Sequence, residues 1–439
     1  MTIEYLKKAT SLPKSTDPKT TAAVQQILSD IKENGRAATE RYARELDGWH
    51  GPLVVTDDVF VRAGRQLSQG MKDDIAFAHS RVKDFAIRQR DALREFEVEL
   101  IDGLIAGQKL IPVNTAGCYI PGGRYAHAAS AIMSICTAKV AGVQNIVAST
   151  PAQKEIGIHP AILYTMQCCG ADTVLALGGA QGVAAMAYGL YTSKPADLIV
   201  GPGNSFVSEA KRLLFGQIGI DVLAGPTETA IIADIHADAD VIASDLAGQA
   251  EHGPDSPVWL FTTSRELGHA VIEKMPSVIA ALPNIAREAA TAAWRDFGEV
   301  IYAPTREELC YISDQYAPEH LQVLAADLDW WLARLTNYGS LFLGEETTVA
   351  YGDKCSGPNH ILPTKGAARY SGGLSVGKFI KTVTYQRLNR SASREVGQVA
   401  ARISRMEGME GHARTADIRL KKYYPQESFE LGMLNDPSR

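Results

Sequence analysis

The spacing of apolar residues separates a polar N-terminal region from a longer region in which strands alternate with helices. Apolar side chains recur at helical spacing across residues 20–46, which predicts a helix there. Residues 77–95 predict a second, charged helix, and its weak apolar face is typical of packing on a partner chain. We therefore expect residues 1–110 to be mostly helical.

From about residue 110 the chain becomes rich in Gly, Ala, Val and Ile. The short apolar runs predict strands at residues 115–120, 145–149, 173–177, 198–200 and 229–233. Residues 130–141 and 159–169, which lie between them, fit amphipathic helices. Such alternation indicates a parallel sheet and the α/β class. Strand-like runs at residues 258–262 and 340–343 predict a second α/β unit, and the end from about residue 379 reads as helical and basic.

Composition excludes several other classes of protein. The 439 residues are 46% hydrophobic and carry a net charge of −6, so the chain is neither disordered nor collagen-like. This charge gives no footprint for nucleic acid, and no run of about 18 apolar residues suits a membrane helix. The first residues lack the apolar core of a signal peptide, and the six cysteines show no CxxC spacing. We expect a cytoplasmic protein with reduced thiols.

Three glycine-rich turns follow predicted strands, where a helix N-terminus is suited to hold phosphate. They are Pro121-Gly122-Gly123, Gly178-Gly179-Ala180-Gln181 and Gly201-Pro202-Gly203-Asn204. None matches GxGxxG, and each alone is equally typical of an ordinary tight turn. Three in one domain favour a nucleotide site.

A few polar residues have the chemistry of zinc ligands. Gln249 and His252 are three residues apart, so they share a helical face before Gly253-Pro254. Asp353 lies in a loop rich in Gly and Pro, and His412 lies near the C-terminus. A single histidine is more often structural than a ligand, and spacing alone does not assemble a site from such distant segments.

Glu319 and His320 follow Pro318, a residue suited to the first turn of a helix over residues 321–335. At a helix N-terminus the dipole favours neutral imidazole, which is able to act as a base. The neighbouring carboxylate is suited to activating water. Helix capping and surface charge are the alternative reading of this pair.

Eight motifs occur in order over about 300 residues. They are Tyr119-Ile-Pro-Gly-Gly, Gly178-Gly-Ala-Gln, Val200-Gly-Pro-Gly-Asn, Ala224-Gly-Pro-Thr-Glu, Gln249-Ala-Glu-His, Ala317-Pro-Glu-His-Leu, Gly357-Pro-Asn-His-Ile-Leu-Pro-Thr and Glu407-Gly-Met-Glu-Gly-His. With them the chain resembles the histidinol dehydrogenase family across nearly its whole length.

This resemblance implies a zinc-dependent, NAD-linked enzyme that oxidises a primary alcohol to a carboxylate in two hydride transfers. By position, the implied zinc ligands are Gln249, His252, Asp353 and His412, and the implied acid/base pair is Glu319 and His320. The implied NAD contacts are Tyr119, Gln181 and Asn204. The implied substrate contacts are Thr227, His360 and Glu407, together with the four zinc ligands and His320.

The resemblance also implies a homodimer of two Rossmann-like domains with small helical N- and C-terminal segments exchanged between subunits, so that His412 completes the site of the other chain. Residues 1–20 form the N-terminal segment in the expected division, and residues 381–439 form the C-terminal dimerisation segment. Residues 111–235 form the NAD-binding domain, and residues 21–110 with 236–380 form the domain of the zinc and acid/base residues.

Departures from the histidinol pattern bear on the substrate. The stretches after Gly123 and after Asp353 resemble the paralogues that oxidise 2,3-dihydroxypropane-1-sulfonate (sulfopropanediol) to sulfolactate. A sulfonate requires basic donors, and the candidates are Arg124, Lys354, Arg369 and Lys378. Glu407 argues the other way, because a carboxylate suits the ammonium group of histidinol. L-Histidinol, another polar alcohol and an inactive relative remain the alternatives.

Overall fold

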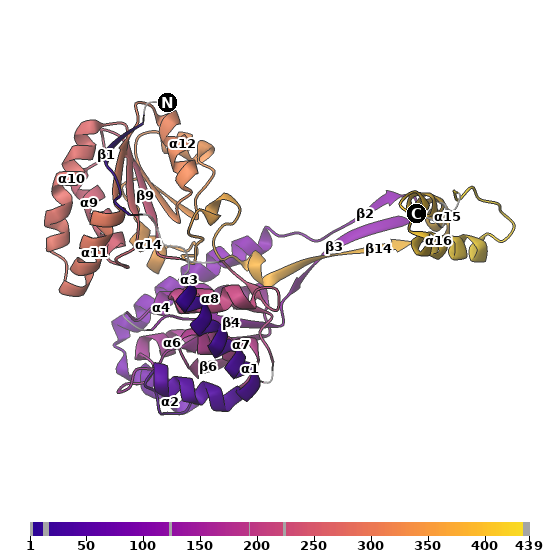
Figure 1. Cartoon of the computed structure of the whole chain (residues 1–439), viewed down its shortest axis with the longest axis horizontal. Coiled ribbons are helices and arrows are strands. Elements are labelled where there is room, and N and C mark those ends of the chain that lie inside the picture. Colours follow the sequence, from indigo (N-terminus) through magenta and orange to yellow (C-terminus); the bar gives the residue numbers. More distant parts are fainter. Residues whose placement is uncertain (1–2, 12–16, 123–124, 193, 223–224, 433–439) are drawn as a thin grey trace. The chain divides into compact units, whose positions relative to one another are not determined.

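The computed structural model describes residues 3–11, 17–122, 125–192, 194–222 and 225–432. Its internal contacts divide the chain into two compact units (Figure 1). Unit 1 comprises Met1–Arg90 and Pro112–Phe379, and unit 2 comprises Asp91–Ile111 and Ile380–Arg439. Unit 1 holds two mainly parallel sheets, so the expected α/β class is confirmed.

The first sheet of unit 1 has five parallel strands in the order β6-β5-β4-β7-β8. The strands are β4 (Thr115–Tyr119), β5 (Asn145–Thr150), β6 (Thr173–Ala176), β7 (Leu198–Val200) and β8 (Gly219–Ile220). The chain runs outward from β4 in both directions, so the strand order reverses at β4, which is the position where open α/β sheets bind ligands.

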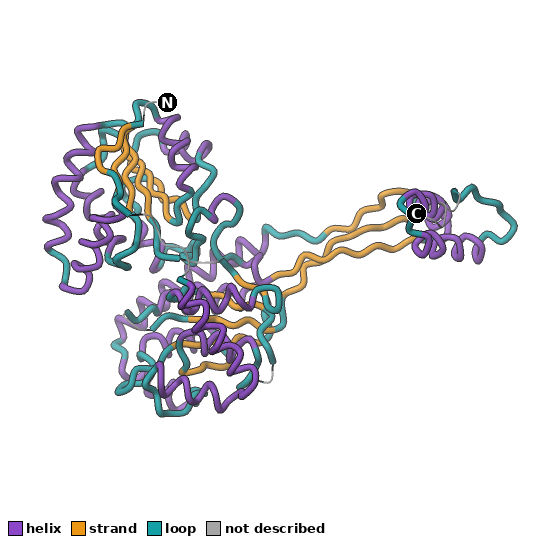
Figure 2. Tube along the Cα trace, viewed as in Figure 1, coloured by secondary structure: helices purple, strands orange, loops and turns teal. Residues whose placement is uncertain are grey.

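Helices cover this sheet, as the purple segments around its orange strands show in Figure 2. They are α4 (Ala128–Ala131), a π-helix (Ile132–Cys136), α5 (Thr137–Ala141), α6 (Pro160–Cys169), α7 (Gly179–Ala187) and α8 (Ser205–Leu214). The expected helix over residues 130–141 is thus interrupted by a π-helical segment. Its apolar side chains are buried throughout.

Helices from the N-terminal region pack on the same sheet domain, contrary to the expected assignment of residues 21–110 to the zinc domain. These helices are α1 (Pro18–Leu46), α2 (Asp57–Gln66) and α3 (Gln69–Asp91). Val24 and Ile31 of α1 share a buried core with Val147 and Leu177, because the apolar stripe of α1 faces helices α7 and α8. Helix α2 packs on α6. Helix α3 buries small apolar side chains within its own chain and ends before residue 95.

The second sheet of unit 1 has the order β1-β11-β10-β9-β12-β13, with only β1 antiparallel to its neighbour. Its strands are β1 (Glu4–Lys7), β9 (Thr229–Ala233), β10 (Val258–Thr262), β11 (Glu299–Tyr302), β12 (His320–Leu324) and β13 (Ser340–Leu343). Two expectations change here. The N-terminal segment supplies an edge strand rather than a helix, and residues 229–233 belong to this sheet rather than to the NAD-binding domain.

The remaining helices of unit 1 accompany this second sheet. They are α9 (Ala239–Ala250), α10 (Arg265–Ala280), α11 (Asn284–Phe297), α12 (Arg306–Tyr316), α13 (Leu328–Arg334), α14 (Val349–Lys354) and the 3-10 turns Ala367–Arg369 and Val376–Phe379. Helices α9, α10 and α11 bury one face of the sheet around Leu246 and Leu260. A separate core on the other face contains Phe261 and Trp331.

Unit 2 combines a three-stranded sheet of order β14-β3-β2 with two helices. Its elements are β2 (Phe96–Ile101), β3 (Leu104–Pro112), β14 (Ile380–Leu388), α15 (Arg390–Met406) and α16 (Glu410–Tyr423). The β2–β3 hairpin was missed in a region expected to be helical, and the C-terminal region begins with a strand. Among the described residues, no helix is both long and apolar enough to span a membrane.

Candidate active site

The three expected NAD contacts lie at or just beyond the carboxyl ends of β4, β6 and β7 in the five-stranded sheet. Tyr119 is the last residue of β4 and is only 4% exposed. Its hydroxyl accepts a hydrogen bond from the backbone N–H of Gly179 at 3.0 Å, and burial raises the pKa of this phenol to about 12. The side chain therefore joins the end of β4 to the turn that follows β6.

Gln181 lies in the first turn of α7 and is 2% exposed. Its Nε2 donates to Oδ1 of Asp47 at 3.1 Å, and Oδ2 of Asp47 accepts from the N–H of Gly178 at 2.8 Å. Burial raises the pKa of Asp47 despite these bonds. Asp47 follows helix α1, and no pattern in the sequence connected it with this turn.

The turn after β7 is shaped by a glycine and a buried ion pair. Gly201 has φ 119°, and a Cβ there would lie 2.0 Å from the carbonyl oxygen of Tyr119. Lys211 Nζ donates to the carbonyl of Gly201 at 3.0 Å and pairs with Asp221, which accepts from the Gly201 N–H at 2.7 Å. Asn204 caps α8 by accepting from two backbone N–H groups at 3.1 Å.

Glu319 and His320 lie at the amino end of strand β12, so the expected helix start is wrong. Helix α12 ends at Tyr316, and Ala317 adopts a left-handed conformation with φ 48° that turns the chain into the sheet. Residues 320–324 are apolar enough to form a fully buried strand, a pattern that periodicity does not distinguish from a buried helix. The argument from a helix dipole therefore does not apply to His320.

The backbone of Glu228, just before β9, holds both side chains. Its N–H donates to Oε2 of Glu319 at 3.0 Å, and its carbonyl lies 3.3 Å from Nδ1 of His320 and accepts from the His320 N–H at 3.1 Å. The Glu228 carboxylate accepts from the N–H of Lys365 at 2.8 Å through Oε1. Strands β9 and β12 lie in the middle of the sheet, and their amino ends thereby fix the positions of Glu319 and His320.

Burial perturbs the protonation of this pair. It raises the pKa of Glu319 to about 8, although the positive charge of His320 acts in the opposite direction. Burial alone would lower the pKa of His320, but the carboxylates of Glu319 and Asp353 raise it to about 9. Shifts of this size in a buried acid and base are typical of active sites.

Asp353, near the end of α14, is the next member of the site. Its Oδ1 lies 3.5 Å from Nε2 of His320, whose positive charge outweighs burial and lowers the pKa of the carboxyl. The carbonyl of Asp353 lies 2.6 Å from Nδ1 of His360, and Nε2 of His360 lies 3.0 Å from Oγ of Ser130. Next to His360, Asn359 donates to the carbonyl of Met133 at 2.8 Å. A cavity of about 290 Å³ borders Asp353, Asn359 and His360.

Gln249 lies in the last turn of α9, whereas His252 lies beyond the end of the helix, which stops earlier than the expected Gly253-Pro254. Helix α9 ends at Ala250, and the N–H of His252 bonds the carbonyl of Gln249 at 3.3 Å in the turn that follows. Oε1 of Gln249 accepts from Thr229 at 3.3 Å. Partial desolvation lowers the pKa of His252, and the nearby Asp353 only partly opposes this effect.

The donors in unit 1 fit a zinc ion in their chemistry. An ionised Asp353, a neutral His252 and the amide oxygen of Gln249 are in the protonation states that a divalent cation requires. Within the described ranges, no group of three His, Cys, Asp or Glu side chains is close enough together to hold a metal. His412, the fourth ligand implied by the resemblance, is not among these donors.

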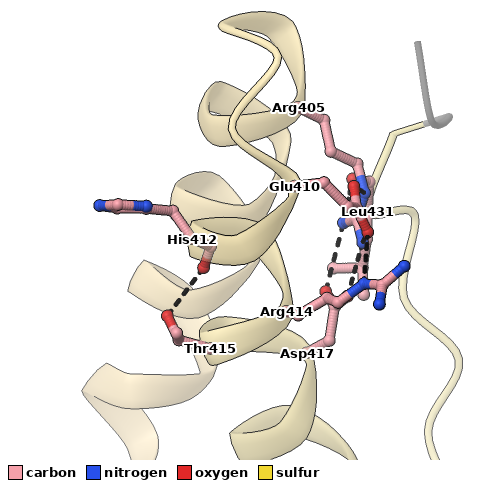
Figure 3. Close-up of polar contacts among 7 residues, drawn as sticks. All are labelled: Arg405, Glu410, His412, Arg414, Thr415, Asp417 and Leu431. Atoms are coloured by element: carbon pink, nitrogen blue, oxygen red, sulfur yellow. Dashed lines mark hydrogen bonds and ion pairs between the residues drawn. The ribbon is translucent and has the colours of Figure 1, made fainter. Parts of the chain in front are cut away.

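His412 and Glu407 belong to unit 2. Helix α16 is pinned to α15 by Arg405, whose guanidinium bonds Asp417 at 2.5 Å, Glu410 at 3.1 Å and the carbonyl of Leu431 at 2.9 Å. Figure 3 shows the imidazole of His412 projecting away from this network, and only its backbone carbonyl is bonded, to Thr415 at 2.7 Å. The exposed imidazole is thus presented on a rigid helix pair.

The remaining residues expected to contact the substrate have different surroundings in the structure. Thr227 is half-buried next to Glu228. Arg369 donates to the carbonyls of Gln315 and Gly366, and Lys378 donates to Ser371 at 3.2 Å. Arg124 lies outside the described residues. Among the three basic candidates that the structure describes, Lys354 is the one whose charge acts on His252, Asp353 and His360.

The sequence did not identify three residues that lie next to a glycine-rich turn or next to other candidate site residues. Asp47 braces the Gly178 turn, Glu228 supports the acid/base pair and His127 lies near Lys354 and His360. Glu228 belongs to the Ala224-Gly-Pro-Thr-Glu motif, which was a usable signal. Asp47 and His127 stand in loops with no pattern of their own.

Comparisons with known proteins agree with this architecture. A profile of the histidinol dehydrogenase family matches residues 11–420. A histidinol dehydrogenase homolog of Pelagibacter ubique is 57% identical over 96% of this chain and 99% of its own. The sulfopropanediol 3-dehydrogenase of Ruegeria pomeroyi is 53% identical over 98% of this chain and 99% of its own. The crystal structure of histidinol dehydrogenase from Elizabethkingia anophelis superposes with a TM-score of 0.88 at 30% identity and covers 94% of both chains. The chain therefore belongs to the histidinol dehydrogenase family, whose members are dehydrogenases acting on CH–OH groups.

Proposed function

We propose that the protein is a zinc-dependent, NAD-linked dehydrogenase that oxidises a polar primary alcohol to a carboxylate through an aldehyde. The observation that carries this proposal is the buried constellation of Glu319, His320 and Asp353 on the Glu228 backbone. It combines two groups with perturbed pKa values and one ionised carboxylate at the edge of a rigid sheet. Each oxidation removes a hydride and a proton from the substrate, so forming the carboxylate requires two NAD and one water.

His320 is the proposed base for the alcohol. Its Nδ1 faces the Glu228 carbonyl and Glu319, at 3.3 and 3.6 Å, which leaves Nε2 facing Asp353. Among the described residues Nε2 has no hydrogen-bond partner although it is buried. The proton of the substrate hydroxyl passes to this atom as the hydride leaves. Because the pKa of His320 is raised to about 9, its deprotonated form, which gains as the pH rises toward 9, is the one that serves as the base.

Glu319 is the proposed base for hydration of the aldehyde. Its Oε2 is held by the Glu228 N–H, so the carboxylate has a fixed direction from which to take a proton from water. Burial raises its pKa to about 8, which makes it a stronger base than an exposed glutamate. The gem-diol that forms then loses the second hydride.

The cofactors supply what these side chains do not. Zinc, held by Gln249, His252, Asp353 and His412, would polarise the substrate oxygen and lower the pKa of the hydroxyl. NAD, held at the carboxyl ends of β4, β6 and β7 by Tyr119, Gln181 and Asn204, would accept each hydride. The chain itself orients the reactants and transfers protons.

Sulfopropanediol, oxidised to sulfolactate, is the proposed substrate. It is supported by the 53% identity to sulfopropanediol 3-dehydrogenase over nearly the whole chain and by the charge of Lys354 beside the site. L-Histidinol is the second candidate, because the family profile matches and Glu407 is present. An inactive relative is the third, and a zinc content near zero would favour it.

The deciding experiment compares kcat/KM for sulfopropanediol and L-histidinol with NAD and zinc under the same conditions. We expect a clear preference for sulfopropanediol and two NADH for each alcohol consumed. A preference for histidinol would overturn the substrate while leaving the mechanism in place. No NAD reduction with any polar alcohol would overturn the enzyme assignment.

We also propose a cytoplasmic homodimer in which unit 2 of one chain completes the site of the other. The support is that His412 and Glu407 are exposed on unit 2, which also exposes the apolar side chains of Leu100, Met406 and Ile418. Mixing the impaired variants His412→Ala and Asp353→Ala tests this directly. Exchange of subunits should restore activity at mixed sites, whereas a site built from one chain would show no recovery.

A further inference from the structure

Helix α4 is joined to the candidate active site by two short contacts of His360. Ser130 lies 3.0 Å from Nε2 of His360, and Nδ1 of the same imidazole lies 2.6 Å from the carbonyl of Asp353. His127 is one helical turn before Ser130, and Lys354 follows Asp353 directly. Two segments more than 200 residues apart in the chain thus bring His127 and Lys354 within electrostatic range of His360.

The surroundings of His127 are electropositive. Burial and then the charges of Lys354, His252 and His360 lower its pKa to about 4, and only Asp353 acts in the opposite direction. The charge of Lys354 also acts on His252 and His360. His127 is therefore a neutral imidazole with an N–H to donate at neutral pH, within electrostatic range of the Lys354 ammonium.

Neither side chain is used by the protein. Within the described part of the chain, no hydrogen bond or ion pair engages the imidazole of His127 or the ammonium of Lys354. The ring of His127 only meets the ring of Tyr125 edge-on, with centroids 6.2 Å apart. The imidazole of His127 is half-buried, and a half-buried polar group without a partner is unfavourable unless water or a ligand satisfies it, whereas the ammonium of Lys354 is exposed to solvent.

We propose that His127 and Lys354 form the subsite for the anionic end of the substrate, an inference that rests on the proposed function. The ammonium neutralises the charge of a sulfonate, and the imidazole N–H bonds one of its oxygens. The reacting hydroxyl then reaches His320 while the anion stays next to His360. A cationic substrate would be repelled by Lys354 at the same place.

Two variants test each donor. Lys354→Gln removes the charge at nearly constant size, and His127→Phe keeps the ring but removes its nitrogens. We expect each to lower kcat/KM for sulfopropanediol by about 10- to 100-fold, mainly through KM, which corresponds to the loss of one charged hydrogen bond.

The matched control is Lys139→Gln. Lys139 lies at the far end of the same helical stretch and pairs with Asp172 at 3.8 Å, so this variant makes the same change of charge away from the site. Its kcat/KM for sulfopropanediol should equal that of the wild type. Unchanged melting temperatures and NADH binding in all variants exclude a folding defect as the cause of any loss.

Binding is measured apart from turnover by calorimetric titration of the zinc-loaded protein with propane-1-sulfonate, propionate and propyl phosphate. Wild type should bind the sulfonate, and Lys354→Gln should bind it at least tenfold more weakly. Tighter binding of the carboxylate or phosphate would identify another anion for the same subsite. Undiminished binding and kcat/KM in both variants would overturn the subsite while leaving the dehydrogenase assignment intact. A wild type that binds propane-1-sulfonate but oxidises no alcohol would overturn the proposed function alone.

Discussion

Asp47 and Gln181 are joined by a hydrogen bond of 3.1 Å between Oδ1 and Nε2, although 134 residues separate them. The second oxygen of Asp47 holds the N–H of Gly178 at 2.8 Å. Because the amide nitrogen of Gln181 is engaged, its Oε1 is the atom left to accept from a ribose hydroxyl or a carboxamide. Asp47 is in this way a positioning residue for the proposed NAD site.

Asp47→Asn should weaken NAD binding more than it slows turnover. The neutral amide cannot accept from both donors as strongly, and the loss of one charged hydrogen bond is about 1.5–3 kcal/mol. We expect KM for NAD to rise about tenfold or more with kcat nearly unchanged. NADH fluorescence titration and steady-state kinetics measure the two quantities.

Asp197→Asn is the matched control for this change. Asp197 accepts from the N–H groups of Asn114 and Thr115, both at 2.9 Å, at the amino end of β4 and therefore at the opposite edge of the same sheet. It should alter the melting temperature without altering NADH affinity. Equal effects of the two variants on NADH affinity would contradict a positioning role for Asp47.

Metal affinity and activity should fall together when a proposed ligand is removed. His252→Ala, Asp353→Ala and His412→Ala each delete one of four donors, so zinc content after dialysis and kcat should both drop by more than about tenfold. Metal analysis by mass spectrometry and an NADH assay provide the readouts. Full activity after chelation with a zinc content near zero would sink the assignment.

Glu319→Gln should separate the two oxidations. The amide cannot take a proton from water, so hydration of the aldehyde slows by about 10²-fold or more, whereas His320 still serves the alcohol. Single-turnover experiments should show a first NADH at a rate near wild type and a delayed second one. If both appear at wild-type rates, Glu319 is not the base.

Glu228→Gln should stabilise the protein at alkaline pH. Burial raises the pKa of Glu228 from about 4.5 to about 7, so the protonated form is the one favoured by folding. That stability is fully present below pH 4.5 and is lost as pH rises through about 7, up to about 3 kcal/mol.

The melting temperature of Glu228→Gln is therefore expected to match wild type at pH 4 and to exceed it at pH 8. The amide oxygen still accepts from the Lys365 N–H, so this bond is not expected to confound the comparison. A difference that does not grow across this interval would show that Glu228 ionises as it does in the unfolded chain.

Strands of both large sheets were predictable because each is a short apolar run bounded by turns. The predicted runs at residues 198–200 and 229–233 coincide with β7 and β9. What the runs did not reveal is which sheet each strand joins. β9 follows the nucleotide-type turns along the chain yet pairs with β10 and β12, because pairing is decided by contacts between distant segments.

The candidate site was predictable where a sequence motif contained the functional side chain. It was not predictable where the position of a side chain depends on backbone conformation or on a contact with a distant segment. Glu319 and His320 were named from their string, but their strand geometry depends on Ala317 adopting a positive φ, which no rule for alanine predicts. Asp47 was missed for a related reason. A carboxylate that braces a turn 131 residues away leaves no local pattern.

Because of the π-helix at Ile132–Cys136, the number of residues in this helical stretch determines which side chains face the candidate site. A π-turn holds one residue more than an α-helical turn, and in this segment the carbonyl of Met133 accepts from Asn359, the neighbour of His360. Deleting one residue between 132 and 136 would restore a continuous α-helix and rotate Ser130 by about 100° relative to α5. Ser130 and His127 would then face away from His360, although none of these three residues would have been replaced. Relatives that differ by an insertion or deletion at this point are accordingly expected to differ in substrate, even where all residues of the acid/base pair and the metal site are identical.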